Sequence, residues 1–149
     1  MNFEQSEDIK SIATKLINKF PDNFSTFDVD QILFLMETTK SPKKYADVKK
    51  VQPPYTYITN VKFIITVYEK NILDFSDAQM HALVLHELMH IDENFTKLVK
   101  HDLEDFRAIV DLFGSNWDSN PDIKDILEDD DASLPVNEET EEVDEIELV

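Results

Sequence analysis

Residues 82–90 read Ala82-Leu83-Val84-Leu85-His86-Glu87-Leu88-Met89-His90, which is an H-E-x-x-H pattern inside an apolar segment. Histidines four residues apart lie on one face of a helix, so His86 and His90 can bind the same tetrahedral zinc ion. Glu87 then lies beside them, where its carboxylate can take a proton from a water molecule. The apolar neighbours predict a buried helix, in which these side chains need a metal or hydrogen bonds to replace water. The pattern indicates metal-assisted hydrolysis, and the alternative is a histidine pair held by hydrogen bonds in the core.

Local signals indicate where this helix begins and ends. Ser76 can act as N-cap, and Gln79 stands three positions later as its capping-box partner, so we expect the helix to begin at about Asp77. The helix must end soon after His90 if a later histidine is to share the metal. A helix that continued to His101 would carry that residue about 16 Å along the axis, which is too far.

A catalytic zinc site needs a third protein ligand and one open position. If the motif helix ends near residues 92–94, the chain can return and bring His101 to the metal, just before a second helix with Asp102 as its N-cap. Glu104 and Asp105 are the other candidates. His101 is favoured because it is a neutral imidazole whose neighbour, Asp102, could either orient the ring or cap the helix.

The other helices and strands are predicted from the spacing of apolar residues. Residues 6–20 form an amphipathic helix, because their apolar residues recur at helical intervals. Three strands are expected at residues 29–36, 45–51 and 57–68, which are rich in strand-forming residues. The second helix should end at Gly114, the only glycine, which stands where a left-handed residue is favoured. Together these elements predict an α+β domain.

The net charge of -18 is concentrated at the C-terminus. Residues 118–149 contain fourteen acidic residues and one lysine, a composition that predicts a solvated, disordered tail. We therefore expect a single domain at residues 1–117, followed by a flexible acidic tail at residues 118–149. The tail is a solubilising extension, a binding segment for a protein partner or an autoinhibitory segment. Its apolar segments at residues 134–136 and 146–149 could dock on an exposed strand or in the cleft.

Composition also limits the expected ligands, partners and compartment. The chain has no cysteine, so a zinc site must use histidine and carboxylate ligands. The polar N-terminus does not resemble a signal peptide and no apolar run is long enough to span a membrane, so we expect a cytoplasmic protein without a membrane partner. Lysines at positions 40, 43, 44, 49 and 50 form the one basic cluster, but the acidity of the chain argues against nucleic-acid binding.

Four segments resemble the phage-type metallopeptidase family, which comprises small zincins related to SprT-like proteins. They are residues 63–67 (FIITV), 73–79 (LDFSDAQ), 85–91 (LHELMHI) and 101–106 (HDLEDF). The resemblance extends from about residue 27 to residue 117, and its most specific part pairs H-E-L-x-H with the downstream His-Asp-x-x-Asp-Phe. It implies zinc on His86, His90 and His101, with Glu87 as the general base.

We therefore expect a minimal zincin-like domain with a small three-stranded sheet, an active-site helix and flanking helices. The expected activity is zinc-dependent hydrolysis of peptide bonds in a protein or peptide substrate, with Glu87 as the general base. Two alternatives stay open. A zinc-dependent nuclease could use three histidines, but it would not need a glutamate directly after the first. A non-catalytic interaction or inhibitor protein, whose acidic tail imitates nucleic acid, would keep its function without the metal ligands.

Overall fold

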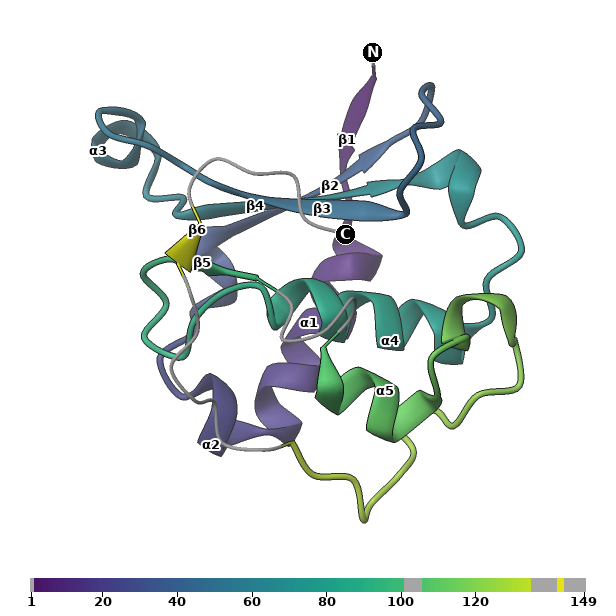
Figure 1. Cartoon of the computed structure of the whole chain (residues 1–149). Helices are drawn as coiled ribbons and strands as arrows, with labels where there is room; N and C mark the ends of the chain where they lie inside the picture. The colour runs from purple at the N-terminus through teal and green to yellow at the C-terminus, as the bar shows by residue number, and fades with distance from the viewer. Residues whose placement is uncertain (1, 101–105, 135–141, 144–149) are drawn as a thin grey trace.

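The computed structural model describes residues 2–100, 106–134 and the backbone of residues 142–143. One layer is a four-stranded sheet of β1 (Phe3–Gln5), β2 (Ile32–Glu37), β3 (Ala46–Lys50) and β4 (Phe63–Tyr68), in the order β1-β2-β4-β3. The helices are α1 (Glu7–Lys19), α2 (Pro21–Phe24), α3 (Tyr55–Thr59), α4 (Asp77–Leu88) and α5 (Arg107–Phe113). Short 3-10 turns lie at Val29–Gln31, Glu69–Asn71 and Trp117–Ser119. Because α1, α4 and α5 lie on one side of the sheet (Figure 1), the fold is α+β, as the sequence predicts.

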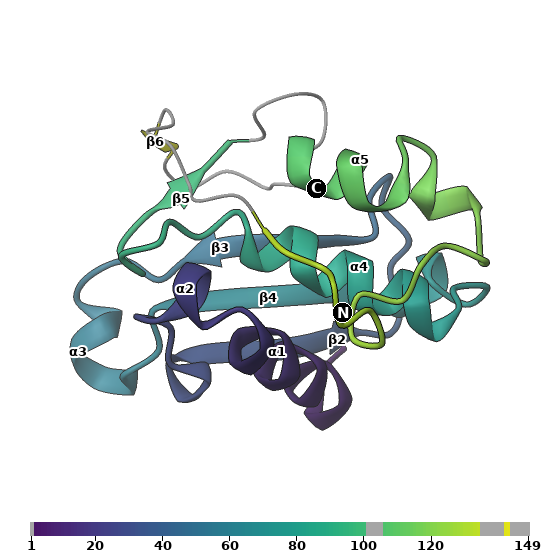
Figure 2. The same ribbon diagram turned by 90° about the horizontal axis from the view of Figure 1, so that it is seen from below.

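Strand pairing gives the sheet one buried face. β2 and β4 are parallel, whereas β1 and β3 pair antiparallel at the two edges. Phe34, Ile65 and Val48 lie opposite one another on β2, β4 and β3, and all three are buried. Side chains alternate between the two faces of a sheet, so this row belongs to the face that is covered by α1 and α4 (Figure 2).

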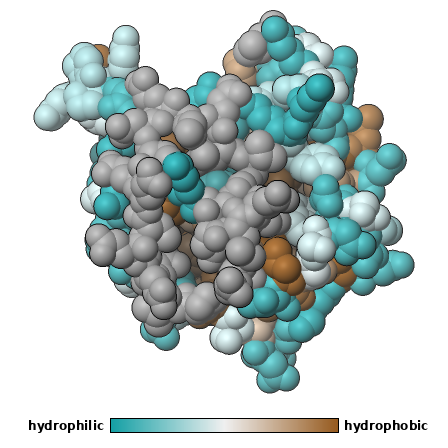
Figure 3. Space-filling view, viewed as in Figure 1, coloured by the Kyte–Doolittle hydropathy of each residue, from teal (hydrophilic) through white to brown (hydrophobic). Residues whose placement is uncertain are grey.

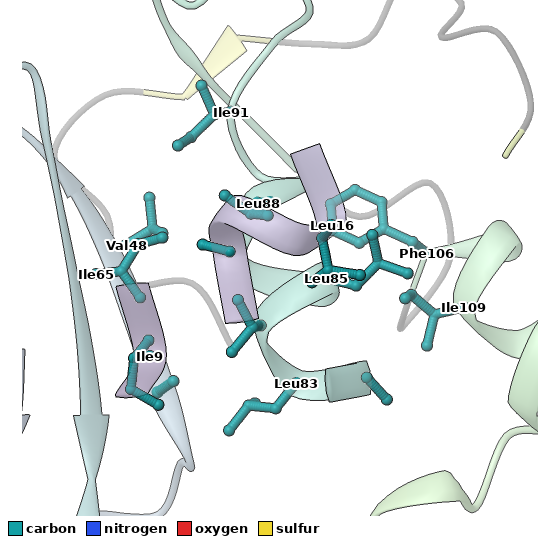
Figure 4. Close-up of a cluster of buried hydrophobic side chains, with 14 of the residues drawn as sticks. Ile9, Leu16, Val48, Ile65, Leu83, Leu85, Leu88, Ile91, Phe106 and Ile109 are labelled. Carbon is teal, nitrogen blue, oxygen red and sulfur yellow. The ribbon is translucent and has the colours of Figure 1, made fainter. Parts of the chain in front are cut away.

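α4 passes through the middle of the molecule, between the sheet and α5 (Figures 1 and 2). Eight of its twelve residues are buried. Its apolar side chains, including Leu85 and Leu88, lie between Ile65 of the sheet and Ile109 of α5 (Figure 4). A helix that is buried on several sides is the environment that the apolar neighbours of the motif predict.

The sheet has one strand more than the sequence predicts, and the other boundaries differ in part. β1 lacks the sequence pattern of a buried strand because all three of its residues are exposed, and it is defined by its pairing with β2. The strand expected at residues 57–68 is α3 followed by β4, and Asn60, at φ 60°, ends α3 in the left-handed conformation. The strand expected at residues 29–36 begins at Ile32, after a 3-10 turn.

The first part of the expected tail differs from the sequence-based expectation, because residues 118–134 pack against the helices. Ile126 is completely buried, and its carbonyl oxygen accepts a hydrogen bond from Lys19 Nζ at 2.6 Å. His81 Nδ1 of α4 lies 2.7 Å from Asp125 Oδ1. Apolar side chains between the acids, together with these partners on α1 and α4, explain why a segment of high charge is folded here. Residues 135–141 and 144–149 of the expected tail lie outside the described part of the chain.

The described surface is mostly hydrophilic on the side shown in Figure 3, in agreement with the high charge of the chain. The most exposed large hydrophobic residues on a helix are Tyr55, Tyr57 and Ile58, all on α3. Among the described residues, no helix combines the length and the apolar character that crossing a membrane requires.

Candidate metal centre

The start of α4 is fixed by the capping box that the sequence predicts. Ser76 Oγ accepts a hydrogen bond from the Gln79 N–H at 3.2 Å, and Gln79 Oε1 accepts one from the Ser76 N–H at 2.9 Å. The helix begins at Asp77, so both predictions are confirmed. Gln79 Nε2 also donates to the carbonyls of Trp117 and Asp118, at 3.2 and 3.1 Å. The same residue therefore caps α4 and attaches the segment that follows α5.

α4 ends at Leu88, earlier than the end near residues 92–94 that the sequence predicts, and the turn that follows it brings His90 next to the other two motif residues. His86, Glu87 and His90 each offer a ligand atom, and these atoms lie within 4.8 Å of one another. Within the described residues this is the one group of three or more histidines and carboxylates with such spacing. His86 is 4% exposed, and Glu87 and His90 are 0% exposed. His86 Nε2 lies 3.9 Å from Glu87 Oε2, so the carboxylate that is expected to take a proton from water lies beside one of the expected metal ligands.

The chain reverses directly after His90, as the sequence predicts. The Asp92 N–H donates to the carbonyl of Lys97 at 2.9 Å, and Asp92 Oδ1 accepts hydrogen bonds from the N–H groups of Thr96 and Lys97, at 2.7 and 3.0 Å. Phe95, inside the turn, has φ 59° and is buried. One aspartate side chain thus replaces the glycine or proline that the sequence lacks at this turn.

The returning strand β5 (Leu98–Val99) is hydrogen-bonded to His90 through the N–H and the carbonyl of Val99. The Val99 N–H donates to the His90 carbonyl at 2.7 Å, and the Val99 carbonyl lies 2.9 Å from His90 Nδ1. A carbonyl can only accept, so Nδ1 of the neutral ring carries the proton and Nε2 has the lone pair that a metal needs. A backbone hydrogen bond that orients a ligating histidine in this way is a regular feature of metal sites.

Two aromatic side chains outside the motif border the histidines. The ring of Phe106 lies 4.8 Å from that of His90 and 5.3 Å from that of His86, measured between centroids. The ring of Trp117 lies 6.2 Å from that of His86. Both aromatic residues are buried, so they shield this side of the site from bulk water. Sequence spacing does not reveal Val99 or Trp117 as parts of the site, because each comes from a different segment, whereas Phe106 ends the downstream segment that the resemblance pairs with the motif.

The expected third ligand, His101, lies outside the described residues, as do its rivals Glu104 and Asp105 and the expected cap Asp102. The second helix is α5, which begins at Arg107 with Phe106 as its N-cap, later than the start expected at Asp102. Its end is as predicted: Gly114 follows Phe113 at φ 87°, and its N–H donates to the Val110 carbonyl at 2.8 Å.

Comparison with known proteins assigns a family to this chain. Residues 1–129 match the family described as "Putative phage metallopeptidase". No curated protein and no solved structure matches the chain. The matched region includes α1 and the packed segment up to residue 129, and it therefore extends beyond the region of about 27–117 that the motifs cover. Because the match covers most of the sequence, the chain belongs to this phage metallopeptidase family.

Proposed function

We propose that the protein is a zinc-dependent metallopeptidase that hydrolyses peptide bonds in protein or peptide substrates. The observation that carries this proposal is the buried cluster of His86, Glu87 and His90, in which the Val99 carbonyl orients His90 with Nε2 as the metal-binding atom. A carboxylate beside two neighbouring imidazoles is the arrangement that metal-assisted hydrolysis requires. The family to which the chain belongs supports the same activity.

The donor set fits zinc better than a hard cation. Imidazole nitrogens suit zinc and related transition metals, whereas calcium and magnesium prefer sites built from oxygen atoms. His86 and His90 provide two nitrogens from one helical turn, and the chain has no cysteine that could replace them. A zinc site here therefore needs one more nitrogen or oxygen ligand and an open position.

The described residues also support His101 as the third ligand. Both backbone groups of Val99 are bonded to His90, so the chain has returned to the metal ligands at this point. His101 is two residues further along, and two residues of extended chain span at most about 7 Å. Its imidazole is therefore within reach of the same metal, whereas Glu104 is three residues more distant in the chain.

The roles of the protein groups follow from this arrangement. When bound, zinc supplies a Lewis acid that polarises the scissile carbonyl and lowers the pKa of water. Glu87 accepts a proton from the attacking water and delivers it to the leaving nitrogen. Phe106 and Trp117 keep bulk water away from one side of the imidazoles, which strengthens electrostatic interactions inside the site. We assign substrate alignment to β3, because it is an edge strand and an extended peptide can pair with such an edge.

Replacing Glu87 by glutamine tests this proposal. The Glu87→Gln variant should keep its zinc while peptide hydrolysis falls by at least about 100-fold, the usual effect of losing a general base. The matched control is Glu93→Gln, because Glu93 is an exposed carboxylate just after the motif and its loss should leave hydrolysis unchanged. Full hydrolysis by Glu87→Gln would contradict the mechanism. Nuclease activity that is unaffected by Glu87→Gln would favour a nuclease instead.

A further inference from the structure

β5 has one backbone edge that is not used by the metal centre. Val99 directs both its N–H and its carbonyl toward His90. Successive residues of an extended strand direct these groups to opposite sides, so Leu98 directs its own away from His90. An open strand edge of this kind is a template for an additional extended segment.

A segment from the far end of the chain lies on this edge. β6 (Glu142–Val143) pairs antiparallel with β5, with Leu98 opposite Val143 and Val99 opposite Glu142. Both ribbon views show the two strands side by side (Figures 1 and 2), and they form a two-stranded sheet separate from the four-stranded one. The pairing places a segment of the acidic tail two strands away from His90, which corresponds to about 10 Å.

The charges that flank the two strands in the sequence are complementary. β5 is preceded by Lys97 and followed by Lys100, whereas β6 is preceded by Glu141 and followed by Asp144. Basic residues therefore flank the acceptor strand in the sequence and acidic residues flank the segment that pairs with it, and opposite charges favour their association.

We propose that the β5 edge is an acceptor site for extended acidic peptide segments, and that the chain's own segment Glu142–Val143 occupies it and lowers hydrolysis at the metal centre. β5 orients His90 through Val99 and leads directly to His101, so a strand paired with it restricts both the approach to this side and the movement of the ligands. External segments of the same acidic and apolar character compete with the tail. The effect on hydrolysis rests on the proposed function, whereas the docking does not.

The first test breaks the pairing without changing the core. In the full chain, Val143→Pro removes the N–H opposite Leu98, and Val149→Pro is the control because residue 149 lies outside the pair. Amide hydrogen exchange at Leu98 should be at least about 10-fold faster in Val143→Pro and unchanged in Val149→Pro. Peptide hydrolysis should rise in Val143→Pro alone. Unchanged exchange at Leu98 in Val143→Pro overturns the docking.

The second test uses the absence of native cysteine to check the register. Directly opposite residues of antiparallel strands are close enough for a disulfide, so Val99→Cys with Glu142→Cys should cross-link within one chain. Val99→Cys with Val143→Cys is one residue out of register and should cross-link at least about 10-fold more slowly. The oxidised matched pair should hydrolyse peptides more slowly than the same variant after reduction.

Each outcome of these tests separates the docking from the proposed function. Equal cross-linking of the two cysteine pairs overturns the proposed register. Register-specific cross-linking with the same hydrolysis before and after reduction overturns the regulatory role. Register-specific cross-linking in a zinc-loaded protein that hydrolyses no peptide in any form overturns the proposed function and supports the docking.

Discussion

Replacing Ile126 by alanine tests where the folded domain ends. The composition of residues 118–149 predicts a tail, but the structure buries the Ile126 side chain completely and bonds its carbonyl to Lys19 of α1. Because the Ile126 side chain is part of the core, the substitution should destabilise the whole domain. If the segment is solvated, the substitution must have almost no effect.

The size of the effect follows from the atoms that are removed. Isoleucine has three side-chain carbons more than alanine, and burying each contributes about 0.8 kcal/mol. The cavity left behind adds to this loss, so we expect Ile126→Ala to lower the free energy of unfolding by about 3 kcal/mol. Leu73→Ala is the control, because Leu73 is 74% exposed and its truncation should change the free energy of unfolding by less than about 0.5 kcal/mol.

Urea unfolding followed by circular dichroism measures both variants. With an m-value of about 1.5 kcal/mol/M, the expected loss lowers the unfolding midpoint by about 2 M, without a change in m. A midpoint shift of Ile126→Ala as small as that of Leu73→Ala would refute the packing and would place the end of the domain near residue 117. By the same reasoning, a chain ending after residue 117 should be less stable than one ending after residue 134, because only the longer chain retains Ile126.

Three further predictions concern the third zinc ligand, the turn after α4 and a buried carboxylate at the end of β2. His101→Ala should weaken zinc binding by more than about 100-fold, whereas Glu104→Ala should have little effect. Zinc titration against a competing chelator measures both affinities. A larger loss of affinity in Glu104→Ala than in His101→Ala would make Glu104 the ligand. Asp92→Ala leaves the N–H groups of Thr96 and Lys97 without their acceptor and should cost about 2 kcal/mol in urea unfolding, with zinc binding weakened as well. Burial alone would raise the pKa of Glu37, but hydrogen bonds from the Thr39 hydroxyl and from the N–H groups of Lys40, Thr39 and Asn2 outweigh it and lower this pKa. A carboxyl group whose pKa is lower in the folded state stabilises the fold above the pKa of the unfolded state, and this stability is lost as the pH falls through the pKa of the folded state. The free energy of unfolding of the native chain should therefore decline below about pH 4.5. The Glu37→Gln variant should show less of this decline.

The parts of the fold that the sequence predicts correctly are those fixed by neighbouring residues. The capping box of Ser76 and Gln79 identifies the first residue of α4, and Gly114 identifies the end of α5. His86 and His90 come together because their spacing is close to one helical turn, although α4 itself ends at Leu88. In each case the residues that make the interaction lie within a few positions of one another, so a sequence pattern contains all of the information.

The parts that the sequence does not predict depend on partners far along the chain. β1 is a strand because Phe3 pairs opposite Glu37, and Ile126 is folded because it meets α1. α3 consists of residues with high strand propensity, yet it is helical, since propensity is weak where no neighbouring strand offers a pairing edge. Val99 and Trp117 belong to the site through contacts with His90 and His86 that no local sequence pattern predicts.

The reversal after α4 gives a physical reason why metal binding and tail docking should influence each other. β5 lies between His90 and β6, so His90 and β6 hold Leu98 and Val99 in place from opposite sides. A metal that fixes the His90 ring also fixes its hydrogen bond to the Val99 carbonyl, which holds β5 extended and gives β6 an ordered edge. Linkage requires the converse, so a docked tail must tighten zinc binding by the same factor. If the docked tail inhibits hydrolysis as proposed, it also strengthens zinc binding. The Val143→Pro variant should therefore hydrolyse peptides faster and bind zinc more weakly than the native chain.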